Sequence, residues 1–230
     1  PSPAALEDEA GRWHNPEFTM LEWYRPGIKP DGMLEEIDLF LQSILNTKPL
    51  LIKTYQAAFE AACGMNPFDV NISVLKQCLT RFNLTNILAP DESDIDQYLF
   101  LLMSHVVEPA LAQYDGPVAV INFPITQAAL ARIQDNVAER FEVYYQGIEL
   151  ANGFHELTDV DMQAARFEAD NQKRTVLGRA PRAIDTRFLA AMAHGMPQST
   201  GVALGVDRLL ALLLQHHHIQ TCLAFDVSRA

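Results

Sequence analysis

The residues best suited to chemistry lie in the C-terminal stretch 199–214. Gly201 and Gly205 interrupt an apolar run, and an Asp-Arg pair follows them. Glycine in a buried strand lets another backbone or a ligand approach closely. Arg208 then falls in the first turn of an expected apolar helix, where a permanently charged guanidinium needs an anion. A structural carboxylate and an anionic ligand both meet that need, and this segment alone does not decide between them.

A second candidate is Glu22, which lies in a stretch with the alternation of a strand. Phe18, Met20 and Tyr24 share its face. A carboxylate among large apolar groups needs a cation or hydrogen-bond donors. The alternative is a partly solvated face on which Glu22 pairs with a surface lysine.

A third group of polar residues follows two expected strands that turn at Gln146-Gly147. The second strand is expected to bulge or bend at Asn152-Gly153, a pair that favours positive φ. Acids converging on one sheet face need neutralising, and magnesium held by carboxylates and phosphate oxygens would do so. The alternative is an edge strand whose acids face solvent. The residues concerned are Glu142, Glu149, Asn152 and Glu156.

The elements that must position these residues can be read from periodicity and caps. Residues 30–115 are mostly helical in pattern, with expected helix caps at Asp31, Thr54 and the acidic stretch 91–94, and we interpret them as an insertion or covering layer. Residues 117–123 suit a buried strand. A helix over 158–174, a basic loop over 173–182 and a helix over 185–194 complete the pattern.

Composition limits the classes of function. The chain of 230 residues is 49% hydrophobic with a formal net charge of −12, which is typical of a globular protein and argues against a large nucleic-acid surface. No apolar run is long enough to span a membrane, and no leader is recognisable. Three scattered cysteines predict reduced thiols and a cytoplasmic location.

Four motifs in order carry a family resemblance: residues 14–24, 139–142, 147–156 and 201–208. Together they resemble class II lysyl-tRNA synthetases. They look closer still to the synthetase paralogues that attach β-lysine to a lysine of elongation factor P. The resemblance covers nearly all of residues 11–230. It implies an α+β fold, a mainly antiparallel sheet flanked by helices, in one catalytic domain over 1–230 with a helical insertion at about 30–115.

The resemblance also implies roles for individual residues and a reaction. ATP and Mg²⁺ would be used to activate lysine or β-lysine as an adenylate, which is then ligated to elongation factor P. Arg208 and Glu149 are the implied catalytic residues. His14, Phe18, Glu149 and Arg208 would bind ATP, with Phe18 stacked on adenine and His14 near the phosphates. Glu142 and Glu149 would hold magnesium, and the substrate pocket would comprise Glu22, Tyr24, Asn152, Glu156 and Ala203.

Two features favour the paralogues over a tRNA-charging enzyme. Ala203 stands where lysyl-tRNA synthetases usually have glycine, and a pocket methyl is worth roughly 1–3 kcal/mol of discrimination. The acidic net charge and the lack of a recognisable anticodon-binding barrel make tRNA an unexpected partner.

The sequence also departs from the family pattern. The first family motif, which supplies much of the homodimer interface, would precede residue 1. Leu6 stands where the second motif has its α-phosphate arginine, and Arg12 falls in a loop. Losing such a donor predicts a rate about 10²–10³ lower. Two alternatives therefore stay open: a fragment of a lysyl-tRNA synthetase, and an inactive chain that binds nucleotide, lysine or a protein partner.

Overall fold

The computed structural model describes residues 11–176 and 178–226. The strands are β1 (Met20–Pro26), β2 (Leu51–Thr54), β3 (Val118–Phe123), β4 (Ile133–Gln134), β5 (Val137–Tyr145), β6 (Ile148–His155) and β7 (Ser199–Gly205). The helices are α2 (Pro30–Leu45), α3 (Tyr55–Cys63), α4 (Ile72–Arg81), α5 (Ile95–Leu102), α6 (Glu108–Leu111), α7 (Val160–Val176), α8 (Thr186–Ala193) and α9 (Val206–Leu213), with short turns η1 (Met103–Val107), η2 (Ile125–Gln127) and η3 (Ile219–Thr221).

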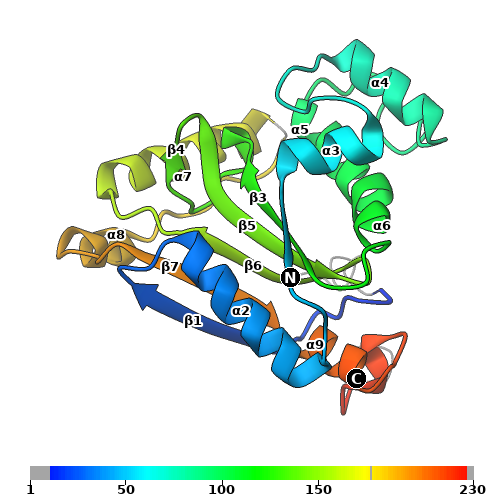
Figure 1. Cartoon of the computed structure of the whole chain (residues 1–230). Coiled ribbons are helices and arrows are strands. Elements are labelled where there is room, and N and C mark those ends of the chain that lie inside the picture. The colour runs from blue at the N-terminus through cyan, green and yellow to red at the C-terminus, as the bar shows by residue number, and fades with distance from the viewer. Residues whose placement is uncertain (1–10, 177, 227–230) are drawn as a thin grey trace.

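The strands form one seven-stranded sheet at the centre of the molecule (Figure 1). Its order is β1-β7-β6-β5-β3-β2, with the short β4 paired to β5. Every pairing is antiparallel except that of β2 with β3. The sheet and its flanking helices confirm the predicted α+β fold with a mainly antiparallel sheet.

The two faces of the sheet are covered differently. One face packs α2 and α9 against residues such as Val143, Val202 and Leu204. The other face packs α3, α5, η1 and α6 against Val118, Val120 and neighbouring residues of β3 and β5. These helices cover only the β3–β5 part of their face. They leave the β6, β7 and β1 part of the same face uncovered, and a site can form there.

The expected helix starts are mostly confirmed, with one correction. Thr54 and Asp94 cap α3 and α5 through side-chain oxygens that accept backbone N–H bonds. Asp31 does not cap α2, because the helix starts one residue earlier at Pro30 with Lys29 as its N-cap. Proline suits a first helical position because its missing N–H would have no partner there.

The helical block does not begin at residue 30 as a separate layer. Helix α2 packs on the sheet and β2 is one of its strands, so the helices that form a layer of their own run from α3 to α6. The single-domain organisation stays a prediction. No helix among the described residues is long and apolar enough to cross a membrane.

Candidate active site

A straight row of four predicted site residues crosses four neighbouring strands. Glu22 of β1 lies opposite Ala203 of β7, which lies opposite Asn152 of β6, and Asn152 lies opposite Glu142 of β5. Residues directly opposite each other in a sheet point to the same face. The row therefore lies on the face that the helices leave open over β6, β7 and β1.

A bulge in β6 brings a second acid to this face. The pairing steps from Val143–Ala151 to Tyr144–Glu149, so β6 has one extra residue there. Without the bulge, Glu149 and Asn152 would point to opposite faces, because they are three residues apart. The expected bend at Asn152-Gly153 is wrong, since both residues keep regular pairs. The turn at Gln146-Gly147 is confirmed, with φ of 53° and 74°.

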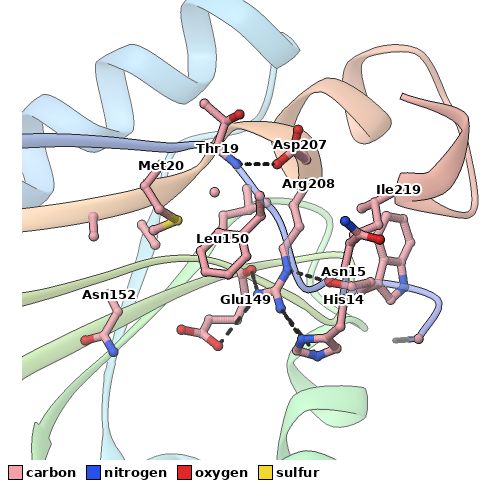
Figure 2. A pocket seen from close by; sticks show the side chains of 16 residues that line it. His14, Asn15, Thr19, Met20, Glu149, Leu150, Asn152, Asp207, Arg208 and Ile219 are labelled. Atoms are coloured by element: carbon pink, nitrogen blue, oxygen red, sulfur yellow. Dashed lines mark hydrogen bonds and ion pairs between the residues drawn. The ribbon is translucent and has the colours of Figure 1, made fainter. Parts of the chain in front are cut away.

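A pocket of about 770 Å³ opens beside this row (Figure 2). It lies where β1, β6 and β7 meet the start of α9 and the segment before β1. The structure brings six predicted residues together in its lining: His14, Phe18, Glu149, Asn152, Ala203 and Arg208. A volume of several hundred Å³ is the size of ordinary small-ligand sites.

Arg208 is the most firmly held side chain of the pocket. Its Nε donates to the Trp13 carbonyl at 3.1 Å and its Nη1 to the Glu149 carbonyl at 2.6 Å. Nη1 also lies 3.8 Å from the Glu149 carboxylate, and Nη2 lies 3.4 Å from the His14 ring. Figure 2 shows the guanidinium between these two residues. Among the described residues a single ion pair, the 3.8 Å contact with Glu149, balances its charge, so the site can accept an anion as well.

The same guanidinium affects the pKa of His14. Burial and the neighbouring charge of Arg208 lower the pKa of its imidazole. A neutral imidazole beside a cation can accept or donate a hydrogen bond without adding positive charge. Asp207, which precedes Arg208 in the sequence, fixes the entry to β1, because its carboxylate accepts from the Thr19 N–H at 2.7 Å.

A second group of predicted site residues lies further along the same strands. A Cβ on Gly201 would meet the Glu156 carboxylate at 2.4 Å and the Tyr24 ring at 2.4 Å, so both side chains close over this glycine. Burial raises the pKa of Glu156 to about 7. Burial, together with Glu156 and Glu22, also raises the pKa of Tyr24. The buried Oδ1 of Asn152 accepts no hydrogen bond from the described residues. A ligand ammonium would satisfy this acceptor and these acids together.

The surroundings of Glu22 differ from the expectation of a buried carboxylate. Glu22 is exposed, as are Phe18 at 62% and Tyr24 at 53%. The partly solvated alternative is therefore the correct one for this face, although Glu22 forms no ion pair with the described residues. The exposure follows because the helices that pack on this face cover only β3 and β5 and leave β1 uncovered.

Glu142 is buried, and both of its carboxylate oxygens already have donors. Arg140 donates to one oxygen and the Tyr144 hydroxyl to the other. Arg140 is itself held by the Gln127 carbonyl at 2.9 Å and lies over the Phe123 ring. These contacts fix the orientation of the Glu142 carboxylate and leave its second lone pairs for a cation.

A third carboxylate, Glu108 at the start of α6, was missed by the sequence analysis. Burial and the nearby Glu149 and Glu142 raise its pKa to about 7. Burial and Glu142 likewise raise the pKa of Glu149 to about 7. The helical pattern around Glu108 gave no sign that it would reach this site, because only the packing of α6 on β5 brings it there.

These acids fit a divalent cation bound together with phosphate. Among the described residues, no group of three or more His, Cys, Asp or Glu side chains is arranged to hold a metal. Magnesium, however, usually takes one or two carboxylates and completes its shell with water and phosphate oxygens. Glu142 and Glu149 supply that number, and a bound cation would favour the ionised form of Glu149, whose pKa is raised by burial and by Glu142. Their assignment as magnesium ligands stays a prediction.

Two further sequence predictions concern the arginine that binds the α-phosphate in the family's second motif. Leu6, which stands at the family's arginine position, lies outside the described residues. Arg12 points elsewhere, because its Nε donates to the His217 carbonyl at 2.7 Å.

The sheet is mainly antiparallel, Arg208 lies at the start of α9, and Glu142 and Glu149 lie on the neighbouring strands β5 and β6. This combination defines a class II synthetase catalytic domain. Residues 7–229 match the family model described as tRNA synthetases class II (D, K and N). The chain belongs to this family.

Curated relatives agree with this assignment. The chain is 46% identical over 226 residues to proteins of Edwardsiella ictaluri, Hamiltonella defensa and Haemophilus influenzae. Each alignment covers 97% of this chain and 69% of the relative. All three relatives are named elongation factor P–(R)-β-lysine ligase.

Proposed function

We propose that this chain activates (R)-β-lysine with ATP and joins it to a lysine side chain of elongation factor P. The observation that carries the proposal is the cross-strand row Glu22–Ala203–Asn152–Glu142, which joins an amine-binding end to the pocket of Arg208. The names of the curated relatives support the same reaction. They also favour it over the lysyl-tRNA synthetase alternative.

The reaction has two steps. In the first, a carboxylate oxygen of β-lysine attacks the α-phosphorus of ATP, an acyl-adenylate forms, and pyrophosphate leaves. In the second, the neutral amine of the acceptor lysine attacks the acyl carbonyl. An amide forms, AMP leaves with the bonding electron pair, and the amine loses a proton. Both steps depend mainly on positioning and on neutralising phosphate charge.

Different residues would position ATP, its phosphates and the metal ion. Arg208 would pair with the terminal phosphates, and its backbone-carbonyl contacts hold the guanidinium ready. Phe18, exposed at the pocket wall, offers a ring for the adenine, and His14 lies beside the phosphate-binding guanidinium. Glu142 and Glu149 would hold Mg²⁺, which when bound neutralises phosphate charge.

The amine end sets substrate class. Glu156 and Tyr24 close over Gly201, and Asn152 lies opposite Ala203 on the same sheet face with a buried Oδ1 that accepts no hydrogen bond from the described residues. An ammonium there would meet anionic or accepting oxygens. Ala203 sits in the middle of the row, so its methyl reaches the space between the amine end and the phosphate end. We assign it the choice between a β-amino and an α-amino acid.

The proposal also covers the cellular location, the excluded substrate and the oligomeric state. The reaction consumes ATP and modifies a translation factor, which places it in the cytoplasm, and tRNA is not among the expected substrates. A homodimer is the form expected from the family. Size-exclusion chromatography with light scattering tests that form independently of activity.

ATP–pyrophosphate exchange followed by transfer tests the function. We expect exchange with (R)-β-lysine to exceed that with α-lysine, and label to pass from the adenylate to purified elongation factor P but not to tRNA. Exchange with neither amino acid, alongside measurable ATP binding, would contradict the proposal and favour the inactive alternative. Transfer of α-lysine to tRNA would instead favour the lysyl-tRNA synthetase alternative.

A further inference from the structure

The end of the α7–α8 hairpin, where the two helices are joined, is a basic segment of an acidic chain. Residues 171–187 hold five basic residues and one acid, a net charge of +4 in a chain whose net charge is −12. The five are Lys173, Arg174, Arg179, Arg182 and Arg187, and the acid is Asp185. Such a local excess of one sign directs the approach of an oppositely charged partner.

The hairpin stands next to the amine end of the candidate site. It leaves the sheet after β6, directly beyond Glu156, and returns at the start of β7, directly before Gly201. Figure 1 shows α7 and α8 beyond this end of the sheet, away from α9. The hairpin therefore borders the part of the site where the acyl group is held, and not the part where Arg208 lies.

The basic loop is folded against α7. The Asn171 side chain accepts from the Arg182 N–H at 2.7 Å and donates to the Arg182 carbonyl at 2.8 Å. Arg174 donates from Nε to the Ala180 carbonyl at 2.9 Å. A surface whose loop is already ordered loses less conformational entropy when a partner binds.

Charges on this surface are unevenly neutralised. A hollow of about 530 Å³ separates the loop from the start of α5. Lys173 is paired with Asp94 at 2.7 Å, and the Asp185 carboxylate caps α8. Asp170 also lines the hollow. Arg179 and Arg182 are exposed, and no ion pair joins either of them to another described residue.

We propose that the α7–α8 hairpin docks an acidic patch on the acceptor protein, next to the lysine that receives the acyl group. This inference rests on the proposed function, because it assumes a protein acceptor. The occupant is a compact acidic protein surface rather than a nucleic acid. A long polyanion would extend beyond the hairpin over a chain that is otherwise strongly acidic, whereas a local acidic patch would contact only the basic end of the hairpin, where Arg179 and Arg182 are exposed.

Direct binding of purified elongation factor P to this chain tests the inference. We expect the double variant Arg179→Glu/Arg182→Glu to raise the dissociation constant about 10-fold or more at low salt. Added salt should weaken the binding of the parent protein and leave that of the variant nearly unchanged. Lys76→Glu, an exposed charge reversal on α4, is the control and should leave binding unchanged.

Adenylate formation is measured on the same proteins to separate the two proposals. ATP–pyrophosphate exchange should be equal in parent and double variant, because neither arginine lines the Arg208 pocket. If the parent protein shows no ATP–pyrophosphate exchange, but its binding to elongation factor P is still weakened by the double variant, the proposed function is refuted. The docking surface is then supported. Binding unaffected by the double variant, or undetectable in the parent, would refute the docking surface. Loss of tRNA binding in the variant with factor binding unchanged would also refute it, and would identify a nucleic-acid surface instead.

Discussion

Arg208 and Glu156 occupy the two ends of the candidate site, and each is a charged group that the protein leaves incompletely paired. Arg208 is braced by two carbonyls but has only a 3.8 Å contact to a carboxylate. Glu156 is 9% exposed and burial raises its pKa. Incomplete pairing of this kind is costly in a folded chain, and a ligand of opposite charge would remove the cost.

Replacing Arg208 by lysine should lower the rate of ATP–pyrophosphate exchange by about 10²–10³. Lysine keeps the charge but cannot reach the Trp13 and Glu149 carbonyls with one planar group while facing a phosphate. The measurement is exchange at saturating amino acid, with circular dichroism to confirm folding. Arg25→Lys, a surface arginine paired with Glu36, is the matched control. Equal rates in the two variants would contradict the role of Arg208.

Binding of lysine or β-lysine should strengthen about 10-fold between pH 6 and pH 8. Burial raises the pKa of Glu156 to about 7, so below that pH the side chain is neutral and lacks the charge that attracts an ammonium. As pH rises through 7 the carboxylate forms and affinity increases. Calorimetric titration without ATP measures this.

Glu156→Gln should bind the amino acid weakly at every pH. Other nearby acids titrate in the same range, among them Glu149 with a pKa raised to about 7, so the readout is the difference between the parent protein and this variant. An unchanged pH profile in Glu156→Gln would show that Glu156 is not the group responsible.

At the scale of elements, β6 and β7 decide where the site residues point. Strand, turn and helix assignments followed from periodicity and caps, because those signals are local. The bulge at Glu149 could not be predicted in this way. The chain carries no glycine or positive φ there, and the extra residue is defined only by pairing with β5. Glu108 was missed for a related reason, because its approach to the acids depends on packing between distant segments. The row of four site residues was recognisable as a motif set, but its straight register emerged only from the strand pairings.

The two glycines of these strands should respond differently to alanine. A methyl on Gly201 meets the movable ends of Glu156 and Tyr24, so Gly201→Ala should fold normally and bind amino acid at least 10-fold more weakly. A methyl on Gly153 meets the buried Phe141 ring at 2.1 Å and the Gly201 carbonyl at 2.6 Å. Gly153→Ala should therefore lose about 1–3 kcal/mol of stability.

Thermal unfolding and amino-acid titration of both variants test this contrast. The expectation fails if Gly201→Ala is the less stable variant, or if it binds amino acid as the parent protein does.

At the scale of the whole molecule, the helices α3 to α6 share a core with the sheet. Tyr55 and Phe59 of α3 belong to the same buried cluster as Val118 and Val120 of β3, and the two rings stack at 4.6 Å. A block with a core of its own could unfold separately, whereas a shared core couples the two parts. The sequence indicated a helical insertion, but it could not show how far its core is continuous with that of the sheet.

This continuity predicts a single cooperative unfolding transition. Phe59 is fully buried, so Phe59→Ala should cost about 3–5 kcal/mol through lost burial and a cavity. Tryptophan fluorescence reports the catalytic part, because Trp13 and Trp23 both lie there, while far-ultraviolet circular dichroism reports all helices. Both signals should shift together in denaturant. Leu39→Ala, on the exposed side of α2 at 69% exposure, is the control and should change stability by less than about 0.5 kcal/mol. A dichroism transition that moves while the fluorescence transition stays would show that α3 to α6 unfold as a separate unit, and the single-domain organisation would be wrong.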